Sequence, residues 1–387
     1  MRGRRRSSRS GLLRGLFWQA VVLGAVGLLV WVLVRNTLSN LEQRHVATGF
    51  AFLGRVTGVP IGSTVLDYDP TTSTYGLAFL IGIINTLRVW IVSAIAATVL
   101  GVVAGLSKLS RNWLLRTTAS WYVGAIRNVP CLLQILFWVA LIEHLGAPDA
   151  ALKPLPGVYL SNRGLAFPWI DAQPGFQWTM VALAAGVVLF GLIRRLLRGR
   201  DAMAAKPGMS WGLAFLLVVG LPLAAFMLTG MPATWEVPEP SLFDFTGGAQ
   251  VTSEFAALAI GLSVYSSGYI AEVVRAGVLA VPRGQWEAAS SINLGMPATL
   301  RWVVLPQALR AIVPPLTSQY LGLLKNSSLA IVIGYQDIVA VANLSLTQTG
   351  QAVEAVILIM AVYLSLSVLI SVPLNLYNAR VLARGAR

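Results

Sequence analysis

The chain has 387 residues, of which 56% are hydrophobic and 11% are charged, and the hydrophobic residues lie in long blocks, which excludes a soluble fold and predicts a polytopic membrane protein. Its formal net charge of +14 would indicate nucleic-acid binding in a soluble chain. Here Lys and Arg gather in short loops at alternate ends of the blocks, as the positive-inside rule requires, so we expect no nucleic-acid partner. With Cys131 as its one cysteine, and only His45 and His144, we expect neither a disulfide nor a Cys/His metal site.

The first hydrophobic block, residues 15–34, has the roughly 20 apolar residues that cross a bilayer. Arginines from Arg2 to Arg14 precede it, which predicts a cytoplasmic N-terminus. A signal-peptide core has roughly 7 to 15 apolar residues and ends at a small-residue cleavage site, whereas this block is longer and has no such site. We therefore expect an uncleaved first helix.

Seven more apolar segments follow, and the basic loops between them belong in the cytoplasm. We predict an all-α polytopic protein of about eight transmembrane helices, in contact with the lipid bilayer and with both termini cytoplasmic. The predicted spans are residues 15–34, 76–105, 121–142, 176–193, 211–231, 255–280, 311–341 and 353–373.

Two segments are predicted to be irregular. Residues 146–175 are rich in Pro and Gly, which is typical of an irregular extracytoplasmic loop. The seventh span is predicted to be a broken helix, which a membrane tolerates only where protein or a wet cavity satisfies the freed backbone groups. The residues that interrupt it are Pro314, Pro315, Lys325, Asn326 and Gly334.

The loop after the sixth span is predicted to hold a short separate helix over residues 285–294, because Pro282 and Gly284 end the membrane helix. Trp286, Ala289 and Asn293 share one face at helical spacing. Ala288 and Ala289 are small enough for a partner's backbone to approach closely.

The end of that short helix has two candidate positions, Asn293 and Gly295, since both residue types tolerate the left-handed conformation that stops a helix. Leu294 lies between them. Pro297 suits the first turn of a second helix, which Leu305-Pro306 is expected to close.

At these residues the chain resembles the permease subunits of bacterial ABC importers, whose cytoplasmic loop has Glu-Ala-Ala, three residues, Gly, nine residues, Ile, one residue and Leu-Pro. Glu287-Ala288-Ala289 and Leu305-Pro306 match at that spacing, with Val303 in the Ile position. Asn293 stands where the family has Gly. Asparagine is the next-best residue for a left-handed helix end, so this departure weakens the resemblance little.

Further strings are similar to the polar amino-acid branch of these importers, and general L-amino-acid permeases have a comparable long insertion. The resemblance covers residues 76–142 and 255–373, and it implies a five-helix type I permease core with an added N-terminal helix and an inserted helical hairpin. The matching strings are residues 85–87, 122–123, 127–130, 305–310 and 324–329. The implied parts are 1–75, with the first helix and a periplasmic segment; 76–144, the first part of the core; 145–253, the insertion; and 254–387, the second part of the core with the coupling loop 281–310.

The resemblance implies a location in a bacterial inner membrane and partner subunits that hydrolyse ATP. The chain has no Gly-x-x-x-x-Gly-Lys-Ser/Thr phosphate loop, so we expect it to be no enzyme and to bind no cofactor itself. A separate ATP-binding-cassette ATPase dimer, carrying ATP and Mg, is expected to receive the coupling residues, with a second homologous permease and a periplasmic amino-acid-binding protein completing the system. The expected coupling residues are Trp286, Glu287, Ala288, Ala289, Asn293, Leu294, Gly295 and Pro306. The alternative is an interfacial segment that only caps two membrane helices.

Polar residues inside the membrane are candidates for the substrate path, because such residues usually face a cavity or a partner helix. The seventh span carries Lys325, Asn326, Ser327 and Ser328 well inside the bilayer, where a helix break would aim their polar groups at an amino acid. These four can equally serve helix packing, with Lys325 reaching a neighbour's carbonyls.

Asn85 and Arg127 are the other candidates for the substrate path. Arg127, with Pro130, can mark a purely structural helix irregularity instead. Glu272 and Arg275 form an i, i+3 pair, which favours a structural role.

Two other classes of function compete with an importer. A secondary amino-acid transporter driven by an ion gradient predicts internal repeats and a carboxylate near mid-membrane; no repeat is evident, and Glu272 is predicted near the cytoplasmic face. A membrane-embedded enzyme predicts a nucleophile-base pair or metal ligands, which the two distant histidines do not supply.

Overall fold

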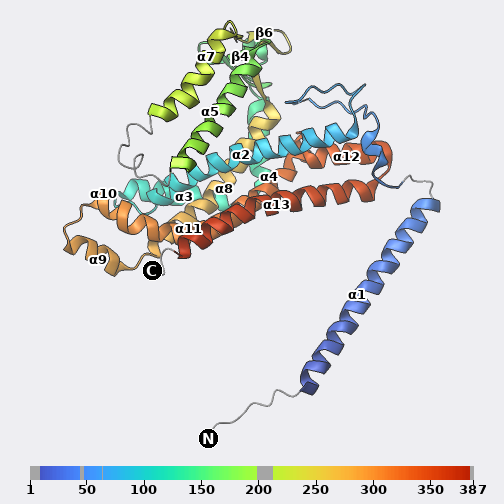
Figure 1. Ribbon diagram of the computed structural model, residues 1–387, viewed down its shortest axis with the longest axis horizontal. Helices are drawn as coiled ribbons and strands as arrows, with labels where there is room; N and C mark the ends of the chain where they lie inside the picture. The colour runs from blue at the N-terminus through green and yellow to red at the C-terminus, as the bar shows by residue number, and fades with distance from the viewer. Residues whose placement is uncertain (1–8, 44–47, 63, 198–211, 384–387) are drawn as a thin grey trace. The chain divides into compact units, whose positions relative to one another are not determined.

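The computed structural model describes residues 9–43, 48–62, 64–197 and 212–383, and most of these are helical (Figure 1). The chain divides into two compact units, unit 1 with Met1–Val129 and Leu262–Arg387, and unit 2 with Pro130–Gly261. The predicted helical class is confirmed. Several predicted features lie outside the described residues: Trp211 at the start of the fifth predicted span, His45, and arginines that we expect in the cytoplasm, namely Arg2, Arg4, Arg5, Arg6, Arg198, Arg200, Arg384 and Arg387.

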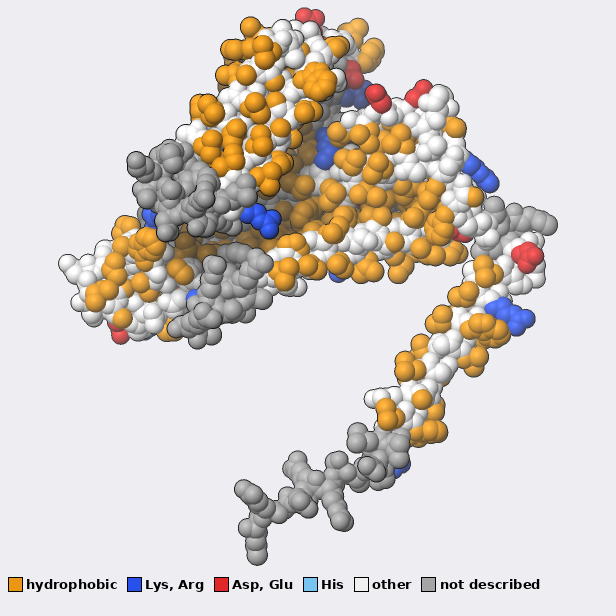
Figure 2. All heavy atoms as spheres, in the orientation of Figure 1, with side chains coloured by type: hydrophobic (Ala, Val, Ile, Leu, Met, Phe, Trp, Pro, Cys, Tyr) orange, Lys and Arg blue, Asp and Glu red, His pale blue; other side chains and the backbone are white. Residues whose placement is uncertain are grey.

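Among the described residues, 5 helices are long and apolar enough to cross a membrane, or up to 7 if each bent helix pair is one span. A shorter apolar helix, Gly212–Leu228, lies where the fifth span is predicted, so the total of eight agrees with the structure but stays a prediction. Figure 2 shows hydrophobic side chains over the visible surfaces of α1 and of α5 and α7, as expected of helices that face lipid. The long helices are α1 (Arg9–Gln43), α2 (Tyr75–Ser107), α5 (Phe176–Leu197), α8 (Ser253–Leu279) and α13 (Ala352–Ala383).

The core of unit 1 forms where α2 packs on other helices. One buried cluster joins α2 to α12 (Ile338–Thr349) and α13, and a second joins it to α8 and α11 (Leu305–Asn326). At the crossing with α8, a Cβ on Gly101 would lie 2.7 Å from Ile270, and one on Gly105 would lie 2.6 Å from the Ala271 carbonyl oxygen. Small residues let membrane helices approach this closely, so these glycines set the distance between α2 and α8.

The segment before α2 contains the 3-10 helix η1 (Phe50–Gly54) and is bonded to the start of α13. The Gly49 backbone N–H donates to Glu354 Oε1 at 2.6 Å, and Gln351 Nε2 donates to the Gly49 carbonyl at 3.1 Å. Asp69 accepts hydrogen bonds from Thr71, which lower the pKa of the Asp69 carboxyl below its usual value.

The seventh span is broken, as predicted. The helix α11 passes into the 3-10 helix η5 (Ser327–Ile333), Gly334 adopts a left-handed φ of 78°, and α12 follows at a bend of 49°. The freed backbone is satisfied by α2, since Asn85 Nδ2 donates to the Gln336 carbonyl at 3.0 Å and Thr86 Oγ1 accepts from the Ile338 N–H at 3.1 Å. Pro314 and Pro315, by contrast, lie inside α11 without ending it; the φ that proline fixes is itself helical.

Residues 146–175 of unit 2 were predicted to be an irregular loop, and this prediction is wrong because they contain four β-strands. After α4 (Cys131–Glu143) and η2 (Pro148–Ala150), strands form an antiparallel sheet in the order β1-β2-β3-β8, and two further strand pairs are β4-β5 and β6-β7. Each strand has at most four residues, too few for a periodic signal, and β8 comes from far along the chain. The strands are β1 (Leu152–Leu155), β2 (Val158–Ser161), β3 (Gly164–Phe167), β4 (Trp169–Ala172), β5 (Ala233–Glu236), β6 (Glu239–Pro240), β7 (Phe245–Thr246) and β8 (Ala249–Thr252).

The inserted helical hairpin is present in unit 2. It consists of α5 and of a second helix in which a π-helical turn, η3 (Leu216–Gly220), leads into α7 (Leu221–Leu228). A Cβ on Gly186 of α5 would lie 1.9 Å from the Leu217 carbonyl oxygen, so the two helices touch backbone to backbone there. Small residues again permit the close contact.

Candidate functional site

The loop after α8 holds a short helix, α9 (Arg283–Ser291), whose end is at Asn293. Asn293 has a left-handed φ of 54°, its N–H donates to the Ser290 carbonyl at 2.9 Å, and the Leu294 N–H donates to the Ala289 carbonyl at 3.1 Å. These two bonds are the Schellman pattern that closes a helix. Gly295 has φ −62° and precedes the next helix as its N-cap, so the turn is at Asn293 and not two residues later.

The two sides of α9 face different surroundings. Ala289 is only 3% exposed, and Trp286 packs against a buried cluster formed by Val281, Val304, Ala308 and Ile312. Glu287 and Ala288 are exposed. Ala289 and Trp286 therefore attach α9 to the protein's own helices, and the surface open to a partner is that of Glu287 and Ala288.

The second helix of the loop departs from the prediction. α10 (Met296–Thr299) has Pro297 in its first turn, as expected, but a π-helical turn, η4 (Leu300–Val304), carries it directly into α11. Leu305-Pro306 therefore does not close a helix; Pro306 lies in the first turn of α11. Proline lacks the N–H of the regular helical ladder, and the wider π turn directly before it is where that ladder changes.

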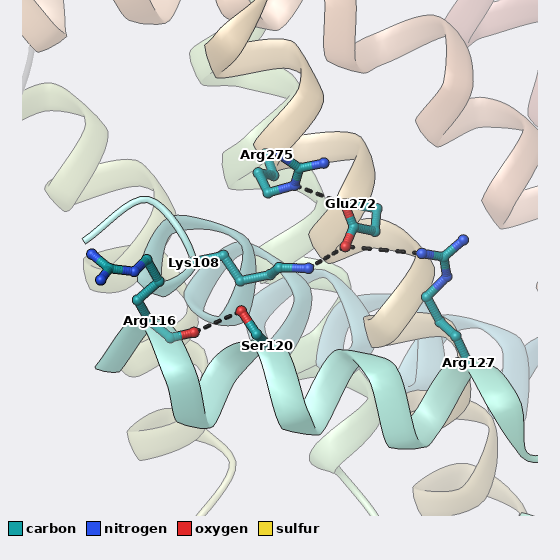
Figure 3. Close-up of polar contacts among 6 residues, drawn as sticks. All are labelled: Lys108, Arg116, Ser120, Arg127, Glu272 and Arg275. Carbon is teal, nitrogen blue, oxygen red and sulfur yellow. Dashed lines mark hydrogen bonds and ion pairs between the residues drawn. The ribbon is translucent and has the colours of Figure 1, made fainter. Parts of the chain in front are cut away.

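A polar cluster forms around Glu272 on α8 (Figure 3). Within the described part of the chain, its carboxylate pairs with Lys108 just after α2, with Arg275 Nε at 2.8 Å, and with Arg127 Nη1 on α3 (Trp113–Asn128) at 3.9 Å. The expected Glu272–Arg275 pair is present. The expected helix irregularity at Pro130 is also present, because α3 ends at Asn128 and α4 begins at Cys131.

A cavity of about 290 Å³ lies beside this cluster. Arg127 is 44% exposed and its guanidinium stands 5.3 Å from the centre of the Tyr269 ring. Ser120, on the same helix, donates its hydroxyl to the Arg116 carbonyl at 2.7 Å. The lining residues are Lys108, Ser120, Val123, Gly124, Arg127, Asn128, Tyr269 and Glu272.

The other substrate-path candidates lie around the break in the seventh span. Ser327 and Ser328 donate their hydroxyls to the carbonyls of Leu324 and Lys325, both at 2.7 Å, so they satisfy the end of α11. The Lys325 side chain is exposed, and Asn326 is half-buried. Asn85 is fully buried and holds the backbone after η5, as described above. Arg127 instead contacts Glu272 and Tyr269.

The sequence has close relatives whose names agree with each other. The family model described as "Binding-protein-dependent transport system inner membrane component" matches residues 201–383. The "Putative amino-acid ABC transporter permease protein YhdX" of Escherichia coli (strain K12) is 44% identical over 368 residues, which cover 95% of this chain and 93% of that protein. This chain belongs to the family of amino-acid ABC transporter permeases.

Other members of this permease family align over nearly the whole chain. The "General L-amino acid transport system permease protein AapQ" of Rhizobium johnstonii is 42% identical, covering 95% of this chain and 92% of that protein. The "Glutamate/glutamine/aspartate/asparagine transport system permease protein BztB" of Rhodobacter capsulatus is 36% identical, covering 91% and 90%. A solved structure titled "Crystal structure of an amino acid ABC transporter with histidines" has a TM-score of 0.46 and 22% identity, covering 79% of this chain and 95% of that one.

Membership of the permease family decides between the two kinds of transporter that the sequence left open. ABC transporter permeases work with ATP hydrolysis, so the ATP-driven importer is supported over the transporter driven by an ion gradient. The family signal also extends across the insertion of residues 145–253, because AapQ and BztB align with nearly the full chain.

Proposed function

We propose that this chain is a membrane-spanning subunit of an importer that moves L-amino acids, polar or of broad range, from the periplasm to the cytoplasm. ATP and Mg bind to a separate ATPase dimer, and a periplasmic amino-acid-binding protein delivers the substrate. The family description names a binding-protein-dependent system, and the names of the relatives specify amino acids. Both termini of the chain and the α9 loop lie in the cytoplasm in this proposal.

A second, similar permease completes the membrane part. Two of the relatives, BztB and BztC of Rhodobacter capsulatus, carry the name of one transport system, and GlnM and GlnP of Bacillus subtilis are likewise two permeases whose names give the same substrate. Both members of each pair are similar to this chain. A heterodimer of two homologous permeases is therefore the assembly that we propose.

Coupling to ATP proceeds through α9. The observation that carries this proposal is the division of α9 into an exposed side with Glu287 and a side with Trp286 and Ala289 that is fixed to the helices. Trp286 packs against a cluster formed by Val281 and by residues of η4 and α11, and Val273 and Val278 of α8 pack against the same cluster, so a displacement of α9 is transmitted to the membrane helices. α11 continues into the broken span with Lys325, which gives a two-state element that ATP and substrate bias from opposite ends.

The charge reversal Glu287→Lys tests this coupling in proteoliposomes that contain the full complex with its binding protein. We expect ATP-driven uptake of L-amino acids to fall at least about tenfold, because an interface charge of the wrong sign costs several kcal/mol. Assembly into the membrane is expected to stay normal, since Glu287 is exposed. ATPase stimulation by the loaded binding protein is measured in the same vesicles and is expected to be lost.

Glu239→Lys is the matched control, because it makes the same change at an exposed position on β6 in unit 2. We expect this variant to transport as the unchanged protein does. Uptake at the normal rate by Glu287→Lys would mean that α9 only caps two membrane helices and does not couple to the ATPase. Uptake that needs no ATP and follows an ion gradient would refute the importer itself.

A further inference from the structure

The cavity beside Glu272 carries charge of both signs. Within the described residues, Lys108, Arg127 and Arg275 surround the Glu272 carboxylate, so positive charge is in excess. A ligand that belongs here must bring negative charge for the cations and must also tolerate the carboxylate. At about 290 Å³ the space is just below the roughly 300 to 1,000 Å³ typical of pockets for drug-sized molecules, so it suits a smaller one.

Arg127 has guanidinium N–H donors that can bind a ligand. Its contacts with the described residues are the 3.9 Å approach to Glu272 and the stacking over the Tyr269 ring, and neither is a hydrogen bond. A guanidinium has five N–H donors in a planar fork that matches a carboxylate. Because Tyr269 supports the guanidinium from one face, the fork edge remains open to the cavity that Arg127 lines.

Glu272, which lies next to Arg127, can accept a further hydrogen bond. One of its oxygens accepts from Lys108 and the other accepts from Arg275, while a carboxylate offers about four lone-pair sites. An ammonium group can therefore bind Glu272 without displacing either partner. A lipid phosphate would meet the same carboxylate as a repelling charge, which disfavours a phospholipid head group here.

We propose that this cavity is a transient site for a free zwitterionic L-amino acid, with its α-carboxylate on Arg127 and its α-ammonium on Glu272. Asn128 and Ser120 line the space left for the side chain. This inference rests on the proposed function and adds a site distinct from the Lys325 to Ser328 segment. It predicts recognition of the two groups that all L-amino acids share, which suits a permease of broad range.

The position of the site favours a role in release. Glu272 lies seven residues before the end of α8, and Val273 and Val278 of α8 pack on the cluster that receives Trp286. A movement of α9 thus reaches the part of α8 that holds Glu272. In the proposed orientation this is the cytoplasmic end of the membrane helices, where an imported amino acid leaves.

The test is equilibrium binding of radiolabelled L-glutamine to the complete permease and ATPase complex in nanodiscs, without ATP and without binding protein. We expect Arg127→Gln and Glu272→Gln to weaken binding at least about tenfold, because each removes a charge-assisted hydrogen bond. Arg116→Gln is the control, since Arg116 lies on the same helix but does not line the cavity. This variant is expected to bind as the unchanged complex does.

Competition with blocked ligands tests the same site without any substitution. N-acetyl-L-glutamine lacks the ammonium and L-glutamine methyl ester lacks the carboxylate, so neither is expected to compete with L-glutamine. The proposal is overturned if Arg127→Gln binds normally, if either blocked ligand competes as well as L-glutamine, or if the unchanged complex binds no L-glutamine. ATP-driven uptake by the same complex, reconstituted into proteoliposomes with its binding protein, separates this failure from that of the importer, because uptake would then persist.

Discussion

The α9 loop and the Glu272 cluster are both polar places in an apolar protein, but they are built in opposite ways. The loop takes its shape from consecutive residues, because the turn at Asn293 closes through bonds to Ser290 and Ala289. The cluster joins side chains from α2, α3 and α8, with Lys108 and Glu272 separated by 164 residues. The loop should therefore tolerate changes in helix packing, whereas the cluster should not.

The largest expected effect is that of Glu272→Ala, which leaves Lys108, Arg127 and Arg275 without their shared carboxylate. These side chains are partly exposed, so we expect a loss of about 2–3 kcal/mol in the free energy of unfolding, below the 3–5 kcal/mol of a fully buried pair. Unfolding in SDS, followed by tryptophan fluorescence, measures it. Glu143→Ala, at an exposed position, is the control and should change little. An equal effect of both variants would mean that the cluster contributes nothing to stability.

Gly105→Ala should have a smaller effect, through packing. The added methyl would meet the Ala271 carbonyl oxygen at 2.6 Å, so α2 and α8 must separate, and overpacking of this kind costs about 1–3 kcal/mol. Gly322→Ala provides the comparison, because a Cβ there meets nothing within 4 Å. The same SDS unfolding experiment measures the free energy of unfolding of both variants. If Gly105→Ala is as stable as Gly322→Ala, close helix approach does not hold the cluster together.

The smallest effect is expected in the loop. Asn293→Ala places a β-carbon without a polar side chain at φ 54°, which costs about 1 kcal/mol locally, whereas Asn293→Gly should be neutral or slightly stabilising. Gly295→Ala should leave α9 unchanged, because Gly295 has φ −62° and a Cβ there would meet only Pro297 Cδ, at 4.0 Å. Hydrogen exchange of the α9 amides measures the difference. Faster exchange of the α9 amides in Gly295→Ala than in Asn293→Ala would mean that the turn that ends α9 lies at residue 295.

Local and hydrophobic features of this protein could be predicted from the sequence. Blocks of apolar residues mark α1, α2 and α8, and Pro282 and Asn293 bracket α9 because proline and asparagine act on the backbone where they stand. The break before α12 is predictable from Gly334, because glycine readily adopts the left-handed φ of 78° found there.

Features that depend on distant partners could not be predicted. The strands β3 and β8 pair across more than 80 residues, and each is too short to show alternation. In the sequence, Ser327 and Ser328 fit substrate contact and helix packing equally well, and only the structure shows that their hydroxyls bond to carbonyls of α11. The pairing of Lys108 with Glu272 requires the close crossing at Gly105, which no local pattern reveals.

The most direct test of the coupling proposal is photo-crosslinking from α9 in the complete transporter. Ala288→Cys and Ala289→Cys are made in a Cys131→Ser background and labelled with benzophenone maleimide. Ala288 is exposed and Ala289 is 3% exposed, so neighbouring positions compare the two sides of one helix. We predict an ATP-dependent crosslink to the ATPase from position 288 and none from position 289. No crosslink from position 288, or an equal one from both, would contradict the assignment of the Glu287 and Ala288 surface as the place where the ATPase binds.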